Sequence, residues 1–249
     1  MSAVKGRRRK PAATARLRPF WLLIVALVLL VGAGAYVVLT LPVFRPREIL
    51  ARGTSVVSPG DVVRRAAIDR GQNMWLQNSS AIVKRVEEIP YVAGAHIERT
   101  WPGIETIVVV ERTPYAIVPS TGGALLVDRD LRVLGPAPDG ARLPQLRAND
   151  IEGADAGTFL SDPGLLSLRD DNQALLDARI TARALEHDKY GDLVATLADG
   201  VRVLFGDDGD LQKKIPLVNP ILNQVGRAGR PIAAIDLRAA DTPVVIYKK

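Results

Sequence analysis

The longest apolar stretch of the chain lies near its N-terminus. No charged residue occurs between Pro19 and Phe44, and Phe20–Leu41 is almost wholly apolar. At the rise of an α-helix, a stretch of this length crosses a bilayer core of about 30 Å. The pattern therefore predicts a transmembrane helix over residues 20–41.

Residues 44–114 carry a pattern that predicts the element order β-α-α-β-β. Apolar runs bounded by turn residues indicate three strands, over Phe44–Arg52, Val92–Arg99 and Glu105–Arg112. Helical spacing with capping residues indicates two helices, from Ser58 towards Gly71 and from Asn78 to Pro90. We expect both helices to cover one face of the sheet. Glu105 shares a face with Ile107 and Val109, so we expect that end of its strand to be exposed.

Residues 115–249 predict a second region that is mostly antiparallel β-structure with helices. Hairpins and closing strands are expected over Leu125–Leu134, Leu193–Phe205, Ile232–Leu237 and Val244–Tyr247. Leu168–His187 has the spacing of a helix. Residues 211–225 have it too, but Pro216 and Pro220 predict a kink or two short helices. Residues 134–164 are expected to be a long loop or weak strands, and the fold class is α+β.

Charge is distributed unevenly along the chain. The net charge is +6, yet residues 1–44 hold seven of the 33 basic residues and none of the 27 acidic ones. By the positive-inside rule, the basic tail (residues 1–19) lies in the cytoplasm and the later domains lie outside the inner membrane. The remaining residues are close to neutral, which does not favour nucleic-acid binding.

A cleaved signal peptide is the competing interpretation of the apolar segment. Ala33-Gly34-Ala35 has the small-x-small form of a cleavage site. However, Val37–Leu41 continues the apolar run past that point, and the basic region before it is long. We therefore expect an uncleaved, single-pass anchor of type II.

Several motifs resemble a known domain and a known family. The first set comprises Ile49-x-Ala51-x-Gly53, Gly71-Gln72-Asn73-Met74-Trp75-Leu76, Pro90-Tyr91-Val92-x-x-Ala95-x-Ile97-x-Arg99-x-Trp101-Pro102 and Ile107-x-Val109-x-Glu111-Arg112-x-Pro114. Together these motifs resemble a POTRA domain, and one anchor directly before such a domain resembles the FtsQ/DivIB family of bacterial cell-division proteins. Ala234-Ile235-Asp236-Leu237-Arg238 resembles that family's closing signature. Residues 125–134 resemble its hairpin, with Leu131 where a Gly is expected.

The resemblance implies a cytoplasmic basic tail (1–19), a transmembrane helix (20–41), a POTRA domain (44–114) and an FtsQ/DivIB-type β domain (115–249). It implies a divisome scaffold in the inner membrane at the septum, recruiting and regulating septal peptidoglycan synthesis. It also implies FtsB- and FtsL-type partners, with further divisome proteins at the POTRA domain. The alternative is a POTRA-containing secretion or outer-membrane assembly factor that binds extended client chains.

The last predicted strand is the candidate site for a partner. Thr242–Tyr247 is expected at a sheet edge, where unpaired N–H and C=O groups accept another strand. Arg238 would add a polar contact, on the strength of the matched signature. The alternative is that Val244–Ile246 are simply core residues. The candidate residues are Arg238, Thr242, Val244, Val245, Ile246 and Tyr247.

The sequence carries no motif of a catalytic, metal or cofactor site. His96 is expected to face solvent in a strand, and His187 to close a helix. Asp207–Asp210 lacks the ligand spacing of an EF-hand and predicts an acidic turn before a helix. No Cys is present. We therefore expect a protein that is not an enzyme, with no cofactor and no small-molecule substrate. An envelope hydrolase is a weaker, third hypothesis.

Overall fold

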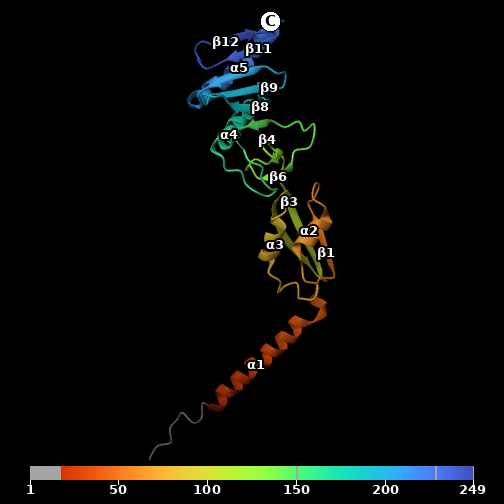
Figure 1. Cartoon of the computed structure of the whole chain (residues 1–249). Coiled ribbons are helices and arrows are strands. Elements are labelled where there is room, and N and C mark those ends of the chain that lie inside the picture. Colours follow the sequence, from red (N-terminus) through yellow and green to blue (C-terminus); the bar gives the residue numbers. More distant parts are fainter. Residues whose placement is uncertain (1–17, 150, 228, 249) are drawn as a thin grey trace, which may run out of the picture.

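The computed structural model describes residues 18–149, 151–227 and 229–248. One long helix is followed by two sheets, which lie one after the other along an elongated molecule (Figure 1). The helix, α1 (Arg18–Thr40), is apolar and exposed. Among the described residues it is the one helix long and apolar enough to span a membrane, over Phe20–Thr40. The predicted basic tail lies, up to residue 17, outside the described residues.

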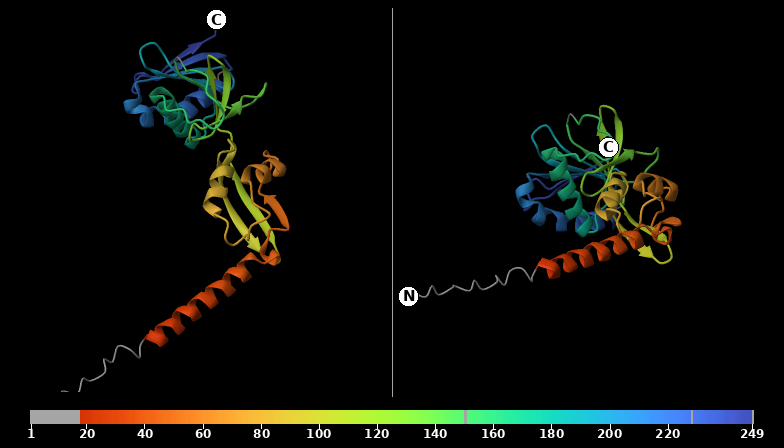
Figure 2. Two further views of the ribbon diagram at one scale, coloured as in Figure 1. Left: turned by 60° about the horizontal axis from the view of Figure 1, so that its bottom comes forward. Right: turned by 90° about the horizontal axis from the view of Figure 1, so that it is seen from below.

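The first sheet has three strands in the order β1-β3-β2, with two helices packed on it (Figure 2). Strand β1 runs parallel to β3, and β2 runs antiparallel to β3. The predicted order β-α-α-β-β is confirmed. The elements are β1 (Glu48–Arg52), α2 (Pro59–Ala66), α3 (Ser79–Glu87), β2 (Val92–Thr100) and β3 (Ile104–Glu111).

Two boundaries in this region differ from the prediction. Strand β1 does not begin at Phe44, because Pro42–Phe44 form the short 3-10 helix η2. Helix α2 ends well before Gly71, because Ala67 adopts a left-handed conformation (φ 47°) that stops it. The predicted cap of α3 is present: Ala81 N donates to the side chain of Asn78 at 3.1 Å.

Glu105 is buried, so the prediction that its end of β3 is exposed is wrong. Its side chain has 0% exposure, and Arg99 Nε on β2 donates to Glu105 Oε1 at 2.7 Å. Arg99 also donates to Ser79 Oγ, at the start of α3, at 2.9 Å. Because the buried carboxylate is paired, it can lie under the helices, and through Arg99 it ties α3 to the sheet.

The second sheet has nine strands in the order β12-β11-β10-β9-β8-β7-β4-β5-β6. The β4–β7, β7–β8 and β10–β11 pairs are parallel, and the others are antiparallel. The α+β fold class is confirmed. The strands are β4 (Ala116–Ser120), β5 (Gly123–Val127), β6 (Val133–Pro136), β7 (Gln145–Arg147), β8 (Ala182–His187), β9 (Leu193–Leu197), β10 (Arg202–Gly206), β11 (Ile232–Asp236) and β12 (Val244–Tyr247).

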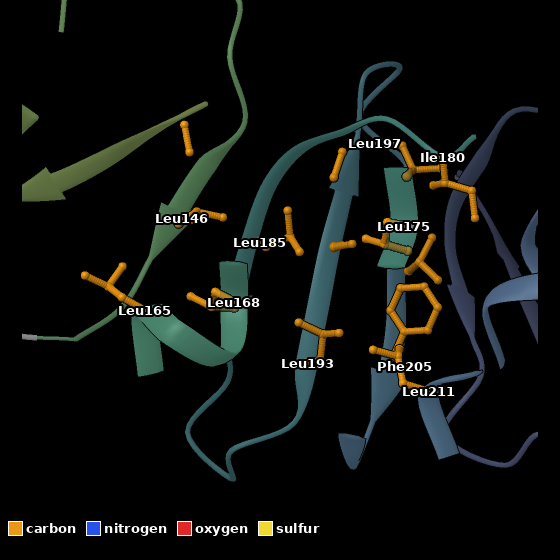
Figure 3. Close-up of a cluster of buried hydrophobic side chains, with 14 of the residues drawn as sticks. Leu146, Leu165, Leu168, Leu175, Ile180, Leu185, Leu193, Leu197, Phe205 and Leu211 are labelled. Atoms are coloured by element: carbon orange, nitrogen blue, oxygen red, sulfur yellow. The ribbon is translucent and has the colours of Figure 1, made fainter. Parts of the chain in front are cut away.

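The core of this region lies between one face of the sheet and two helices, α4 (Pro163–Asp177) and α5 (Leu211–Arg227). Side chains from the two layers meet there (Figure 3). Helix α5 follows η3 (Asp208–Asp210), as the acidic turn predicts. It is one continuous helix despite Pro216 and Pro220, because both prolines lie on its exposed side, where water can bond the freed carbonyls.

The prediction of one helix over Leu168–His187 is wrong. Helix α4 begins earlier, where Leu165 N donates to the side chain of Asp162 at 2.9 Å, and it ends at Asp177. Arg179 then takes a positive φ of 60°, and Ala182–His187 form β8 in the middle of the sheet. The apolar positions of this segment fit the repeat of a helix as well as that of a strand. It forms a strand because β7 and β9 pair with it on either side.

Leu131 has a left-handed backbone, the conformation expected of the Gly that the resembling hairpin carries at this position. It has a φ of 59° and is fully buried, in the turn between β5 and β6. A left-handed backbone costs a residue with a Cβ about 1–2 kcal/mol. Burial of the leucine side chain offsets that cost, since full burial contributes about 1.5–3 kcal/mol.

Candidate partner-binding edge of the large sheet

Strand β12 is an edge of the nine-stranded sheet, with β11 as its neighbour. The register pairs Val244 with Asp236, Val245 with Ile235 and Ile246 with Ala234. In the part of the chain that the structure describes, no strand pairs with the other side of β12. We name that side of β12 the open edge.

One hydrogen bond sets the direction of the backbone groups of β12. Lys248 N donates to Pro231 O at 2.9 Å, so this N–H points towards the chain of β11. Because alternate residues of a strand direct their N–H and C=O groups to the same side, those of Val244 and Ile246 also face β11. The groups of Val245 and Tyr247 therefore face the open edge.

The side chains of β12 alternate between the two faces of the sheet. Val245 lies opposite Ile235, a fully buried core residue, and faces the helices. Val244 and Ile246 lie on the other face and remain 55% and 46% exposed. Val245 is half-buried, and its two neighbours are exposed, so the core interpretation does not hold for Val244 and Ile246. Accessible apolar side chains beside unpaired backbone groups are suited to strand addition.

Tyr247 and Thr242 lie at opposite ends of this surface. The guanidinium of Arg230 lies 4.0 Å from the ring centroid of Tyr247, a cation–π contact at the end of β12. Thr242 precedes the strand, in a turn where its N–H donates to Ala239 O at 3.2 Å. The strand begins at Val244, as its alternation predicts, so Thr242, the first residue of the candidate partner segment, flanks the open edge without being part of it.

Arg238 follows β11 in the chain, two residues after the end of that strand. It forms a two-pronged ion pair with Asp236, from Nε to Oδ1 at 3.0 Å and from Nη2 to Oδ2 at 2.6 Å. This pairing lowers the pKa of Asp236 and raises the pKa of Arg238. Gly206 of β10 packs against it, since a Cβ there would lie 3.0 Å from Arg238 Cγ. Asp236, its ion-pair partner, lies opposite Val244 in the sheet, so Arg238 lies beside the start of β12 and also contacts β10.

Two residues that the sequence did not single out extend the exposed face. Ala234 pairs with Ile246, and Leu204 pairs with Asp236 from the other side of β11. Both are half-buried, and they share the face of Val244 and Ile246. Alternation about the buried Ile235 and Val203 identifies this face within each strand. This alternation does not show that β10 and β11 are neighbours in the sheet, so the shared face could not be predicted from it.

The opposite edge of the same sheet is covered where β6 begins. Segment 157–160 bonds to β6 and the turn before it, through Val133 N to Thr158 O at 2.8 Å, Gly157 N to Val133 O at 2.7 Å and Leu160 N to Leu131 O at 3.0 Å. Arg132 and Phe159 also form a bridge. We name β6, the turn before it (residues 128–132) and this segment the covered edge.

The two histidines lie in different sheets, each within 4.0 Å of a carboxylate. His96 is exposed on β2, with its Nε2 3.5 Å from Glu98 Oε1. His187 ends strand β8, not a helix as predicted, and its Nε2 lies 4.0 Å from Asp171 Oδ2. Among residues 18–149, 151–227 and 229–248, no group of three or more His, Cys, Asp or Glu side chains could hold a metal ion.

Comparison with known proteins adds the family to this geometry. Residues 44–112 match the family model of the FtsQ-type POTRA domain, and residues 116–238 match that of the C-terminal region of cell division protein FtsQ/DivIB. Proteins named cell division protein FtsQ are similar to the chain. Those of Mycobacteroides abscessus and Mycolicibacterium smegmatis are 28% identical over 90% of it. The chain spans 68% and 63% of their lengths. That of Streptomyces collinus is 26% identical, over 86% of the chain and 84% of the relative.

Proposed function

Because this chain belongs to the FtsQ/DivIB family of cell division proteins, we propose that it holds divisome partners by strand addition at the open edge. The family is one of non-enzymatic scaffolds, and the chain is a membrane-anchored divisome scaffold. The partners we propose are FtsB- and FtsL-type proteins. Binding them would recruit and regulate septal peptidoglycan synthesis with no catalytic step in this chain.

We propose the topology from the charges that flank α1. The basic residues before the span favour a cytoplasmic N-terminus, so the chain would be a single-pass, type II protein of the inner membrane. The two sheets would then lie on the extracytoplasmic side, at the septum. The POTRA domain would offer a second surface for other divisome proteins.

The observation that carries the proposal is the free backbone of β12 beside Val244 and Ile246. The match to the family's C-terminal region ends at Arg238, before β12 begins. The open edge is therefore supported by the sheet order and the exposure of its side chains, independently of that match. A partner strand would gain main-chain hydrogen bonds there and an apolar face to pack on.

Val245→Pro tests the proposal at one hydrogen-bond donor, the backbone N–H of Val245. This N–H faces the open edge, so proline removes a donor that the partner strand would use and none that bonds to β11. We expect the affinity for the FtsB/FtsL-type pair to fall by about tenfold, the value of a lost hydrogen bond and added steric conflict. The measurement is titration of the full-length chain in detergent with the purified partners.

Val245→Thr is the matched control, because threonine keeps the shape of valine and its N–H. Equal affinity of the Pro and Thr variants, with both folded by circular dichroism, would contradict strand addition at this edge. The same chains carrying an N-terminal fluorescent protein should form a band at the division plane of living cells. An even signal around the envelope would contradict the proposed location and favour the assembly-factor alternative.

A further inference from the structure

Two exposed tryptophans lie at the end of the first sheet that adjoins α1. Trp75 is 52% exposed and Trp101 is 55% exposed, and Leu76 beside them is 54% exposed. Trp75 and Leu76 belong to the loop between α2 and α3, and Trp101 to the turn between β2 and β3. They are large apolar side chains that the fold of the sheet does not use.

The loop that carries Trp75 is bonded directly to the last turn of the span. Asn73 Nδ2 donates to Leu39 O at 2.8 Å, and Met74 N donates to Phe44 O at 2.9 Å. Met74 is fully buried, which anchors the loop between these two bonds. Because Leu39 lies within the apolar helix, residues 73–76 are held at the level where the span ends.

The turn that carries Trp101 is held at the same level. Arg47 N donates to Gly103 O at 2.7 Å, and the rings of Phe44 and Trp101 lie 5.7 Å apart. Gly103 has a φ of 87°, and a Cβ there would lie 2.8 Å from Arg45 O, so only glycine allows this approach. Both views in Figure 2 show the end of β2 beside the end of α1.

Three arginines and two acidic residues, Glu48 and Asp69, lie on the segments that neighbour these apolar side chains. Arg45 is the first charged residue after the span, and it is exposed together with Arg47 and Arg70. Asp69 lies nearby, but its Oδ1 accepts the N–H of Gly71 at 2.7 Å. A hollow of about 430 Å³, lined by Thr40, Arg45 and the loop from Asp69 to Leu76, opens between α1 and the sheet.

We infer that Trp75, Leu76 and Trp101, with Arg45, Arg47 and Arg70, form a membrane-docking surface for anionic phospholipid. Indole rings favour the boundary between headgroups and acyl chains, and arginines favour lipid phosphates. The occupant follows from continuity with the span, since the bonds to Leu39 and Phe44 place this surface at the bilayer boundary. The first sheet is thereby held against the leaflet, so that the second sheet projects away from it. The inference needs α1 to span a membrane but does not depend on partner binding at β12.

Single-tryptophan variants of the full-length chain in vesicles test this surface. Trp21→Phe removes the tryptophan within the span, and Trp75→Phe or Trp101→Phe then leaves one indole on the proposed surface. Vesicles of phosphatidylethanolamine and phosphatidylglycerol, with lipids brominated near the headgroup end of their acyl chains, supply the quencher. We expect the brominated lipid to quench the fluorescence of a tryptophan at position 75 or 101 several-fold more than that of a tryptophan at a distant site.

The distant site is Tyr190, which is 76% exposed in the turn between β8 and β9 of the second sheet. A Tyr190→Trp variant that lacks all three native tryptophans is the matched control. If positions 75 and 101 are quenched no more than position 190, the surface does not meet lipid and is free for a protein, which overturns the inference.

A second arm tests the charge of the lipid. Replacing phosphatidylglycerol by phosphatidylcholine, or adding salt, should weaken quenching at both positions, because arginine attraction to an anionic surface is screened by salt. Quenching that is independent of headgroup charge and salt overturns the anionic part of the inference. These outcomes involve no partner protein, so they are independent of the test at Val245.

Discussion

The two edges of the nine-stranded sheet differ in whether another segment of the chain bonds to them. At the covered edge, segment 157–160 bonds the backbone groups of Val133 in β6 and the carbonyl of Leu131. At the open edge, Val245 and Tyr247 keep theirs free, and Val244 and Ile246 stay exposed. An uncovered edge invites association with other strands, and proteins commonly block it. Because this chain blocks one edge and not the other, the difference supports a partner at β12.

The two edges also differ in what holds them in place. The covered edge is attached to the first sheet: Arg132 Nη2 donates to Glu87 O at 2.9 Å, and Arg112 pairs with Asp128. Phe159 contacts both Arg112 and Arg132, whose guanidinium carbons are 5.8 Å and 5.5 Å from its ring centroid. The open edge lies at the end of the molecule farthest from α1 (Figure 1). A partner can therefore reach β12 without disturbing the junction between the sheets.

The largest contrast between the edges should appear in the loss of buried side chains. Leu131→Ala at the covered edge should lower the free energy of unfolding by about 2–5 kcal/mol, because it leaves a cavity in the core. Ile246→Ala at the open edge should change that free energy by less than about 0.5 kcal/mol. Urea unfolding of the full-length chain in detergent measures both.

Glycine at position 131 sharpens this prediction. Leu131→Gly loses one more carbon than Leu131→Ala, worth about 0.8 kcal/mol, but relieves a left-handed backbone that costs about 1–2 kcal/mol, so it should be no more destabilising than Leu131→Ala. Equal losses at Leu131 and Ile246 would show that the covered edge is no better integrated into the core than the open one.

A smaller effect is expected at the attachment of the covered edge. Arg112→Met leaves the buried carboxylate of Asp128 without its cation, although the N–H groups of Asp130 and Arg132 still donate to it. The free energy of unfolding should fall by about 2 kcal/mol. Arg129→Met, an exposed site in the same turn, is the control and should be neutral. A neutral Arg112→Met would contradict a rigid junction, and partner binding at β12 should be unchanged in both variants.

The smallest effect is expected for the ion pair beside the open edge. The pKa of Asp236 is lowered by Arg238, so the pair stabilises the fold fully above pH 3.8, the ordinary value for this carboxyl. That stabilisation is lost as the pH falls through the lowered pKa. Because Arg238 is 59% exposed, Asp236→Asn at neutral pH should cost less than about 1 kcal/mol. The measurement is urea unfolding at pH 7 and at pH 3.

A double-mutant cycle provides the control for this pair. Asp236→Asn combined with Arg238→Ala should cost no more than either change alone, since each removes the same contact. Fully additive losses would show that Arg238 acts through another group, such as a partner at the surface.

Part of the candidate site could be predicted and part could not. The alternation of Val244–Tyr247 was enough to predict a strand with Val244 and Ile246 on one face, and the structure places that strand at the edge of the sheet. Arg238 was grouped with them because it belongs to the signature that resembles the family's. That motif could not show that Asp236, opposite Val244, holds Arg238 in a two-pronged ion pair. The covered edge escaped prediction because segment 157–160 has no strand-like pattern of its own.

Elements with a strong local signal were predictable from the residues alone. The apolar length of α1, the cap at Asn78 and the alternation in β9 and β10 each depend on neighbours in sequence. Contacts between distant residues decided the rest. Ala182–His187 became a strand because β7 and β9 lie on either side of it, and Glu105 is buried because Arg99 reaches it from β2. Residues 73–76 meet the end of α1 because Asn73 bonds to Leu39, 34 residues earlier. Such contacts stabilise the protein only once the chain has folded and brought distant residues together. A local sequence pattern therefore cannot predict them.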